Sequence, residues 1–381
     1  MQSALYEAEH EAFRAMLRDF LAKEVVPHHA AWEEAGVVDR SVWLRAGKQG
    51  LLGMDVPEEY GGGGVSDFRY NAILTAEISR VGASGLGFTL QNDVVAPYLI
   101  GLTTDEQKQR WLPGLVSGAI ITAIAMTEPG AGSDLQGLTT TARRDGDEWV
   151  LNGAKRWIGN GTFADLVFVF AKDEDDGAVE TLVVEKGTPG FTATKMEGKY
   201  ALRTVQNADL VFEDCRVPAE NKLADGNTFK DVNRVLELTR GGVAWNAVGC
   251  QMGAFEAALG YARERVQFGR PIAGFQLIQD LIARMAGNVT ASLGMAVRVA
   301  QLQEEGVFRD DHAALAKAFV TSRARETVGW ARELFGGNGI LLENDVVRFF
   351  NDAEALYSYE GTREINHLIV GRALTGHSAF V

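Results

Sequence analysis

The stretch Tyr359-Glu360-Gly361-Thr362 places a carboxylate between an aromatic ring and a glycine. Apolar residues at helical spacing precede and follow it, which predicts two helical segments separated at this point. Glycine costs roughly 0.5–1 kcal/mol relative to alanine inside a helix, so Gly361 favours a break with room for a ligand to approach. Glu360 is therefore a candidate general base. Alone, such a stretch is more often a plain turn or helix N-cap than a catalytic site, so the role of Glu360 depends on the other motifs of the chain.

Composition places the chain among ordinary globular proteins. Of its 381 residues, 46% are apolar and 23% charged, and this length predicts two or three domains. The 37 basic and 51 acidic residues give a net charge of −14, which argues against a general nucleic-acid or anionic-membrane binder. An anionic ligand held by a few local arginines stays compatible with this charge.

The cysteine and histidine patterns predict no metal site. Cys215 and Cys250 form no CxxC motif and are expected to be reduced thiols, and the six histidines form no HExxH or His/Cys cluster. No apolar run reaches about 18 residues, so no membrane span is expected. The first eleven residues resemble neither a secretory signal nor a transit peptide, and we expect a cytoplasmic protein.

Hydrophobic periodicity predicts an α+β protein of three domains. Residues 1–120 show helical spacing, residues 121–229 contain short apolar runs and a hairpin signal at Asp145-Gly146-Asp147, and residues 230–381 return to helical spacing. We expect an N-terminal helical domain, a central antiparallel β-barrel or sandwich, and a C-terminal four-helix bundle. Alternating β-α units are absent, and Leu135 occupies the last glycine position of a GxGxxG pattern, so a Rossmann fold is set aside.

Five short stretches occur in register along the chain. They are Ala125-Met126-Thr127-Glu128-Pro129-Gly130-Ala131-Gly132-Ser133-Asp134, Asn152-Gly153-Ala154-Lys155-Arg156-Trp157-Ile158, Arg263 to Ile272 with Phe275-Gln276, Leu334-Phe335-Gly336-Gly337-Asn338-Gly339, and Tyr359-Glu360-Gly361-Thr362. This set resembles the acyl-CoA dehydrogenase family over essentially the whole chain. The resemblance implies that fold and FAD as the cofactor.

The resemblance also implies which residues contact FAD. They are Met126, Thr127, Gly132, Ser133, Trp157, Ile158, Gly159, Arg265, Phe268, Phe275, Gln276, Glu333, Gly336, Gly337, Thr362 and Glu364. In relatives the Gly336-Gly337 segment comes from a neighbouring subunit, so the resemblance implies a homo-oligomer, with a tetramer expected. Relatives often carry glutamine where this chain has Glu333 and Glu364, and a glutamate cannot donate an amide N–H.

The implied reaction is α,β-dehydrogenation of an acyl-CoA thioester, with Glu360 removing the α-proton. Some relatives place the base instead just before an arginine of an earlier helix, but here that position is Thr239, ahead of Arg240. Only one of the two positions therefore carries a carboxylate. Ser133, Arg240 and Gly361 are expected to contact the substrate.

Several alternatives stay open. The family's electron acceptor is an electron-transfer flavoprotein, although use of O₂ is not excluded, and a flavin oxidase or monooxygenase on the same fold is the second enzyme hypothesis. A flavin-free binding protein on this scaffold is the third. The region from Gly82 to Gln91 holds no arginine for a distal carboxylate, so we expect an apolar, medium to long acyl chain, as in fatty-acid β-oxidation.

Overall fold

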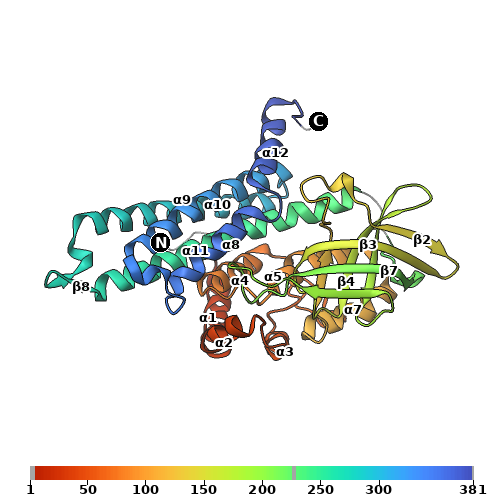
Figure 1. The fold of residues 1–381 in the computed structure, drawn as a ribbon, viewed down its shortest axis with the longest axis horizontal. Coiled ribbons are helices and arrows are strands. Elements are labelled where there is room, and N and C mark those ends of the chain that lie inside the picture. Colours follow the sequence, from red (N-terminus) through yellow and green to blue (C-terminus); the bar gives the residue numbers. More distant parts are fainter. Residues whose placement is uncertain (1–4, 225–228, 380–381) are drawn as a thin grey trace.

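The chain folds into two helical domains that flank a β domain, as the sequence predicts. The computed structural model describes residues 5–224 and 229–379, with only the backbone of residues 229–238. The β sheet lies at one end of the long axis, the C-terminal helices extend to the other, and the N-terminal helices pack beneath both (Figure 1). In the described parts of the chain no helix combines the length and the apolar character needed to cross a bilayer.

The N-terminal domain is helical throughout. Pro27 lies at the start of its second helix, where the missing N–H costs nothing. The helical stretch from Phe88 to Leu102 contains a π-helical turn at Gln91–Val95. The elements are α1 (Ala8–Glu24), α2 (Val26–Ala35), α3 (Ser41–Lys48), η1 (Glu58–Tyr60), α4 (Phe68–Arg80), α5 (Phe88–Leu90), η2 (Gln91–Val95), α6 (Ala96–Leu102) and α7 (Asp105–Ser117).

The central domain is a single seven-stranded sheet with the order β1-β4-β2-β3-β7-β6 and β5 paired to β4. Most pairs are antiparallel as expected, but β4 runs parallel to both β1 and β2. The β2–β3 hairpin lies between β1 and β4 in the sequence and supplies the crossover that parallel strands need. The strands are β1 (Thr122–Ala125), β2 (Thr141–Asp145), β3 (Glu148–Ile158), β4 (Leu166–Asp173), β5 (Val179–Glu185), β6 (Phe191–Lys195) and β7 (Ala208–Pro218), with the short helices η3 (Leu135–Gly137) and η4 (Ala219–Asn221).

The C-terminal domain contains the predicted long helices, and the last of them is divided. The two helical segments predicted on either side of Glu360 are separated at Tyr359–Thr362, and the second segment projects from the body of the molecule (Figure 1). The elements are α8 (Phe229–Glu264), β8 (Val266–Gln267), β9 (Arg270–Pro271), η5 (Ile272–Gly274), α9 (Gln276–Glu304), α10 (Asp310–Leu334), η6 (Gly336–Ile340), α11 (Asp345–Ser358) and α12 (Arg363–Thr375).

A buried glutamate joins helices of the two helical domains. Glu77 of α4 is 1% exposed and pairs with Arg14 and Arg18 of α1 at 3.3 and 2.7 Å, and with Arg80 at 3.1 Å. Arg80 in turn pairs with Glu256 of α8 at 2.8 Å. Burial alone would raise the pKa of Glu77, but the hydrogen bonds and charges of Arg18 and Arg80 outweigh it and lower that pKa.

Replacing Glu77 tests this junction. Glu77→Gln is expected to lower the free energy of unfolding by about 2 kcal/mol, because three arginines lose the carboxylate charge that they share, while all three stay partly solvated. The stabilisation by Glu77 is present above its ordinary pKa of 4.5 and is lost as the pH falls through the lower folded-state pKa. Urea unfolding at pH 7 measures the effect. The exposed partner supplies the control, since Glu256→Gln should cost less than about 1 kcal/mol; equal losses would contradict this account.

Candidate active site

The end of strand β1 is held by a buried ion pair. Lys155 Nζ lies 2.8 Å from Glu128 Oε1, both side chains are essentially inaccessible, and the same ammonium donates to the Met126 carbonyl at 3.2 Å. Glu128 also accepts hydrogen bonds from the backbone N–H groups of Thr139 and Thr140 at 2.7 and 3.0 Å. These contacts therefore fix the backbone of residues 126–128 on the side away from the expected cofactor.

The charges of this pair are set by opposing effects. Burial alone would raise the pKa of Glu128, but hydrogen bonds from Lys155 and Thr140 and the Lys155 charge lower it to about 2. Burial lowers the pKa of Lys155 to about 8, although Glu128 opposes that shift. At neutral pH both groups are charged, and the attraction between them offsets the free-energy cost of burying each charge.

Trp157 is turned out of the sheet by an irregularity in β3. The β3–β7 register shifts between Lys155 and Ile158, and Trp157 has the left-handed φ of 64°, which is uncommon for a bulky residue. Its ring is 55% exposed. A strained, exposed aromatic ring at a strand end is typical of a surface that binds a flat ligand. Ile158 points into the sheet core, so it can offer a ligand only its backbone.

The loop after β1 leaves open space beside Thr127. A side-chain carbon on Gly130 or Gly132 would meet no protein atom within 4 Å, and Gly132 and Ser133 are exposed. The Thr127 carbonyl accepts from the Arg156 N–H at 2.8 Å, which keeps this strand end beside Trp157. The surroundings of Met126, Thr127 and Trp157 therefore fit a planar cofactor with a polar edge.

The second part of the site is the break between α11 and α12. Glu360 is half-buried and has a φ of 54°, and Gly361 follows at 81°, so two consecutive left-handed residues reverse the chain. The Thr362 hydroxyl then accepts from the Ile365 N–H at 3.3 Å and caps α12. This confirms the predicted interruption and explains Thr362 as an N-cap. Glu364 is exposed and hydrogen-bonded to Arg363.

Arg240 of α8 lies beside this break. The side chain is 7% exposed, and one guanidinium nitrogen pairs with Asp310. Its Nε is buried with no hydrogen-bond partner among the described residues, and it lies 3.9 Å from where a side chain on Gly361 would begin. A buried, charged donor without an acceptor is costly, so this atom fits a site that an oxygen of a ligand completes.

A loop from the β domain connects the two parts of the site. Asn207 donates to the Trp157 carbonyl at 3.2 Å, and Lys199 donates to Asn207 Oδ1 at 2.6 Å. In the same loop, the Leu202 N–H donates to Asp352 of α11 at 2.6 Å. Burial raises the pKa of Asp352 to about 6. Trp157 and the helix that ends before Glu360 are therefore joined by a short series of hydrogen bonds.

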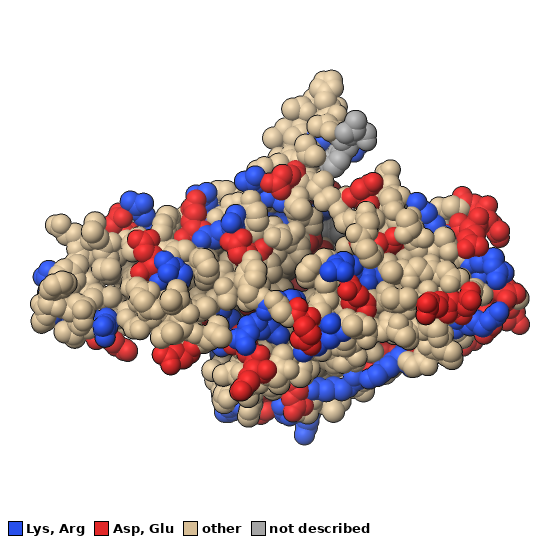
Figure 2. All heavy atoms as spheres, in the orientation of Figure 1, with Lys and Arg blue, Asp and Glu red and all other residues tan. Residues whose placement is uncertain are grey.

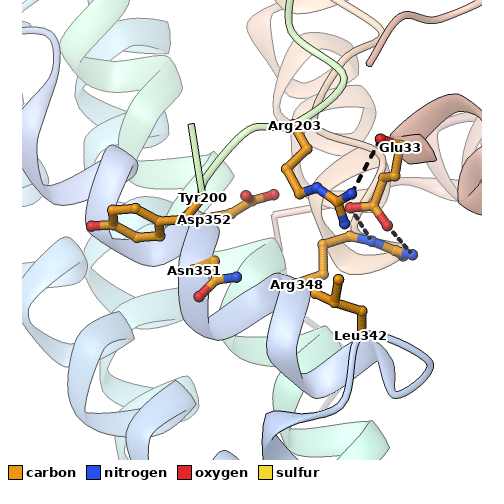
Figure 3. Close-up of a pocket in the computed structure, with 7 residues that line it drawn as sticks. All are labelled: Glu33, Tyr200, Arg203, Leu342, Arg348, Asn351 and Asp352. Carbon is orange, nitrogen blue, oxygen red and sulfur yellow. Dashed lines mark hydrogen bonds and ion pairs between the residues drawn. The ribbon is translucent and has the colours of Figure 1, made fainter. Parts of the chain in front are cut away.

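The same loop meets the N-terminal domain at a small pocket. Figure 3 shows Arg203 of the loop and Arg348 of α11 converging on Glu33 of α2. The Arg348–Glu33 ion pair measures 3.1 Å, and Arg203 donates to the Glu33 carbonyl at 3.4 Å. All three domains thus meet beside the path from Trp157 to α11, which fixes their relative positions at the site.

The remaining candidate cofactor residues lie elsewhere in the chain. Strands β8 and β9 lie at the opposite end of the long axis from the sheet (Figure 1). Phe268 there is 95% exposed with a φ of 50°, and on the face seen in Figure 2 that end carries fewer charged side chains than the sheet end. Gly336 and Gly337 belong to the same end, because Asn338 donates to Tyr261 of α8 at 2.8 Å. These candidates are Arg265, Phe268, Phe275, Gln276, Glu333, Gly336 and Gly337.

Some residues of the site were not anticipated from the sequence. Glu128 and Lys155 stand inside quoted motifs, but their pairing across 27 residues follows only from strand alignment. Lys317 of α10 is wholly buried and donates to the turn that carries Glu360. One signal was available, because Lys317 stands at helical spacing from Ala313, Ala314 and Val320, all of them buried.

Comparison with known proteins gives consistent results across the chain. The family descriptions "Acyl-CoA dehydrogenase, N-terminal domain", "middle domain" and "C-terminal domain" match residues 7–119, 123–215 and 227–375. The chain is 35% identical to the mitochondrial long-chain specific acyl-CoA dehydrogenase of Sus scrofa over 376 residues, covering 97% of this chain and 87% of that protein.

Solved structures agree with this. An acyl-CoA dehydrogenase from Geobacillus kaustophilus superposes with a TM-score of 0.94 at 37% identity, covering 98% of this chain and 100% of that chain. A glutaryl-CoA dehydrogenase from Mycobacterium smegmatis in complex with FADH2 superposes with a TM-score of 0.93 at 30% identity, covering 99% and 97% of the two chains.

The ion pair behind β1 can be tested by removing one partner. Lys155→Met is expected to destabilise the fold by about 3 kcal/mol, because the Glu128 carboxylate stays buried without its cation. The purified variant should also retain less FAD, since the 126–128 backbone loses its support. The midpoint of thermal unfolding and the ratio of flavin to protein measure the two effects. The double variant Lys155→Met/Glu128→Gln removes both charges and should recover part of each loss; a double variant worse than Lys155→Met would contradict this explanation.

Proposed function

The chain belongs to the acyl-CoA dehydrogenase family and is an FAD-dependent acyl-CoA dehydrogenase, and from this premise we propose how its residues divide the reaction. Glu360 accepts the proton from Cα of an acyl-CoA thioester, and a trans-2-enoyl-CoA is formed. The observation that carries this role is the reversal of the chain at the half-buried Glu360, next to Gly361, against which lies an Arg240 Nε that has no hydrogen-bond partner among the described residues.

The choice of base rests on position and chemistry. A general base must come within about 3 Å of the proton that it removes. The alternative position on α8 is occupied by Thr239, whose hydroxyl is no base at neutral pH, and Arg240 follows it. Arg240 Nε, Ser133 and the backbone of Gly361 are the groups that we assign to the thioester and its coenzyme A portion.

FAD would be held by two sets of residues. Thr127, Ser133 and Trp157 offer a polar strand end, a hydroxyl and an exposed ring, with Thr362 and Glu364 at the start of α12. When bound, FAD supplies the acceptor for the hydride that leaves Cβ. Arg265, with its neighbours at the far end of the bundle, would hold the pyrophosphate of FAD bound to another subunit, because an arginine forms charge-assisted bonds with it. At least a dimer is then required, and we favour a tetramer.

The substrate that we favour has an apolar, medium to long acyl chain. Residues 82–91 hold no arginine for a second carboxylate. The relatives include both long-chain and glutaryl-CoA dehydrogenases at similar identity, so overall similarity does not choose between them. Anaerobic titration of the yellow protein with acyl-CoAs of graded length measures the preference directly.

An electron-transfer flavoprotein is the proposed electron acceptor. The second enzyme hypothesis, a flavin oxidase or monooxygenase, would be favoured by rapid O₂ consumption after substrate addition. A flavin-free binding protein would be colourless when purified. The glutamate at position 360 favours the dehydrogenase, because proton removal from Cα needs a base and hydroxylation by O₂ does not require one there.

Glu360→Gln tests the assignment of the base. The variant should keep FAD, because the amide preserves the shape of the side chain, and its bleaching by acyl-CoA under anaerobic conditions should slow by at least about 10³-fold. Rapid-mixing absorbance measures the rate. The control is Glu354→Gln, six residues earlier on α11, which pairs with Arg325 at 2.8 Å and should bleach at the parent rate. Normal bleaching by Glu360→Gln would exclude Glu360 as the base.

A further inference from the structure

Lys317 is a buried cation for which no role has yet been assigned. It lies on α10 with a fully inaccessible side chain, between alanines at positions 316 and 318. Burial lowers the pKa of Lys317 to about 8, although the charge of Glu360 opposes the shift. An ammonium in such surroundings is costly unless it is paired or hydrogen-bonded. Its contacts therefore indicate what compensates for that cost.

Lys317 contacts the backbone on both sides of Glu360 in the sequence. Its Nζ donates to the carbonyl of Tyr357 at 3.0 Å and to the carbonyl of Gly361 at 2.5 Å, one on each side of Glu360. Asn366 of α12 donates to the same Gly361 carbonyl at 2.9 Å. The reversal at Glu360 ends the helical hydrogen-bond pattern, so these carbonyls need other donors. Lys317 and Asn366 supply them.

The charges around Lys317 come from three elements. Glu360 in the turn and Glu364 of α12 favour its charged form, whereas Arg240 of α8 disfavours it. The ammonium therefore lies in the field of the carboxylate whose backbone it holds. A nearby cation stabilises a carboxylate over its protonated form, which is the state that a base needs before it accepts a proton.

We propose that Lys317 is a positioning residue for Glu360: with Asn366 it fixes the turn through the Gly361 carbonyl, and its charge keeps the carboxylate ready to accept the proton. This inference rests on the proposed function, because it presumes that Glu360 is the base. It assigns Lys317 no contact with substrate or cofactor.

Lys317→Met removes the donors and the charge while keeping the length of the side chain. Anaerobic bleaching by a saturating acyl-CoA should slow by about 100-fold, because a misplaced reacting group costs about that much. The concentration of acyl-CoA giving half-maximal rate should change by less than about twofold. The acid limb of the pH–rate profile should move upward by about one pH unit when the cation is absent. A merely structural lysine would leave that limb in place.

Lys199→Met is the matched control. Burial also lowers the pKa of Lys199 to about 8, and its ammonium donates to the carbonyls of Leu202 and Val205, but Glu360 is not among its charged neighbours. Because Lys199 supports the loop that joins the two parts of the site, Lys199→Met should lower stability and slow bleaching, but the acid limb of its pH–rate profile should match that of the parent protein. FAD content reports correct folding of both variants.

If Lys317→Met fails to bind FAD, Asn366→Ala provides a second test of how the turn at Glu360 is held. It removes the second donor to Gly361 without removing a charge, so bleaching should slow by about tenfold with an unmoved acid limb. An unchanged bleaching rate in folded Lys317→Met or in folded Asn366→Ala overturns the inference. If Glu360→Gln still loses bleaching in that case, the proposed function stands without the inference. If the parent protein is not bleached by any acyl-CoA, the proposed function fails, and the inference fails with it.

Discussion

The interruption of the last long helix is the constraint on which the site depends. A helix that stops inside a bundle leaves carbonyl groups without their usual donors, and in a packed interior water cannot replace them. Here the donors come from neighbouring helices, as side chains of α10 and α12 that reach the reversed segment. The backbone that carries Glu360 is therefore held by the surrounding helices.

The β domain contributes rigidity of a different kind. Its strand end is supported by an ion pair that removes both charges from water, and such a pair stabilises only when every hydrogen-bonding group is satisfied. Glu128 meets this condition through Lys155 and two backbone N–H groups. The loop at 196–207 then transmits the position of the sheet to α11 through the Leu202–Asp352 hydrogen bond. Sheet and bundle can therefore hold two halves of one site in register.

The sequence predicts the order of the domains and the break at Glu360, because both follow from local periodicity and glycine placement. It also predicts an antiparallel β domain, whereas β4 pairs in parallel with β1 and β2. Pairing between strands far apart in sequence leaves no local signal. For the same reason it gave no role to Lys317 or to Lys155, since a buried lysine is explained only by the acceptors that folding brings to it. The residue roles proposed from the family resemblance stay proposals.

The distance between Trp157 and Phe268 within one chain has a consequence for genetics as well as for assembly. Consider an oligomer in which the exposed hairpin of β8 and β9 contributes to the active site of a neighbouring subunit. A substitution at Arg265 would then inactivate the neighbour's site, whereas a substitution at Glu360 would inactivate the site of its own subunit. Mixed assemblies of the two defective chains would then regenerate some intact centres, so the two alleles could complement each other. The binding of FAD would also be linked by mass action to subunit association, and dilution would release both together.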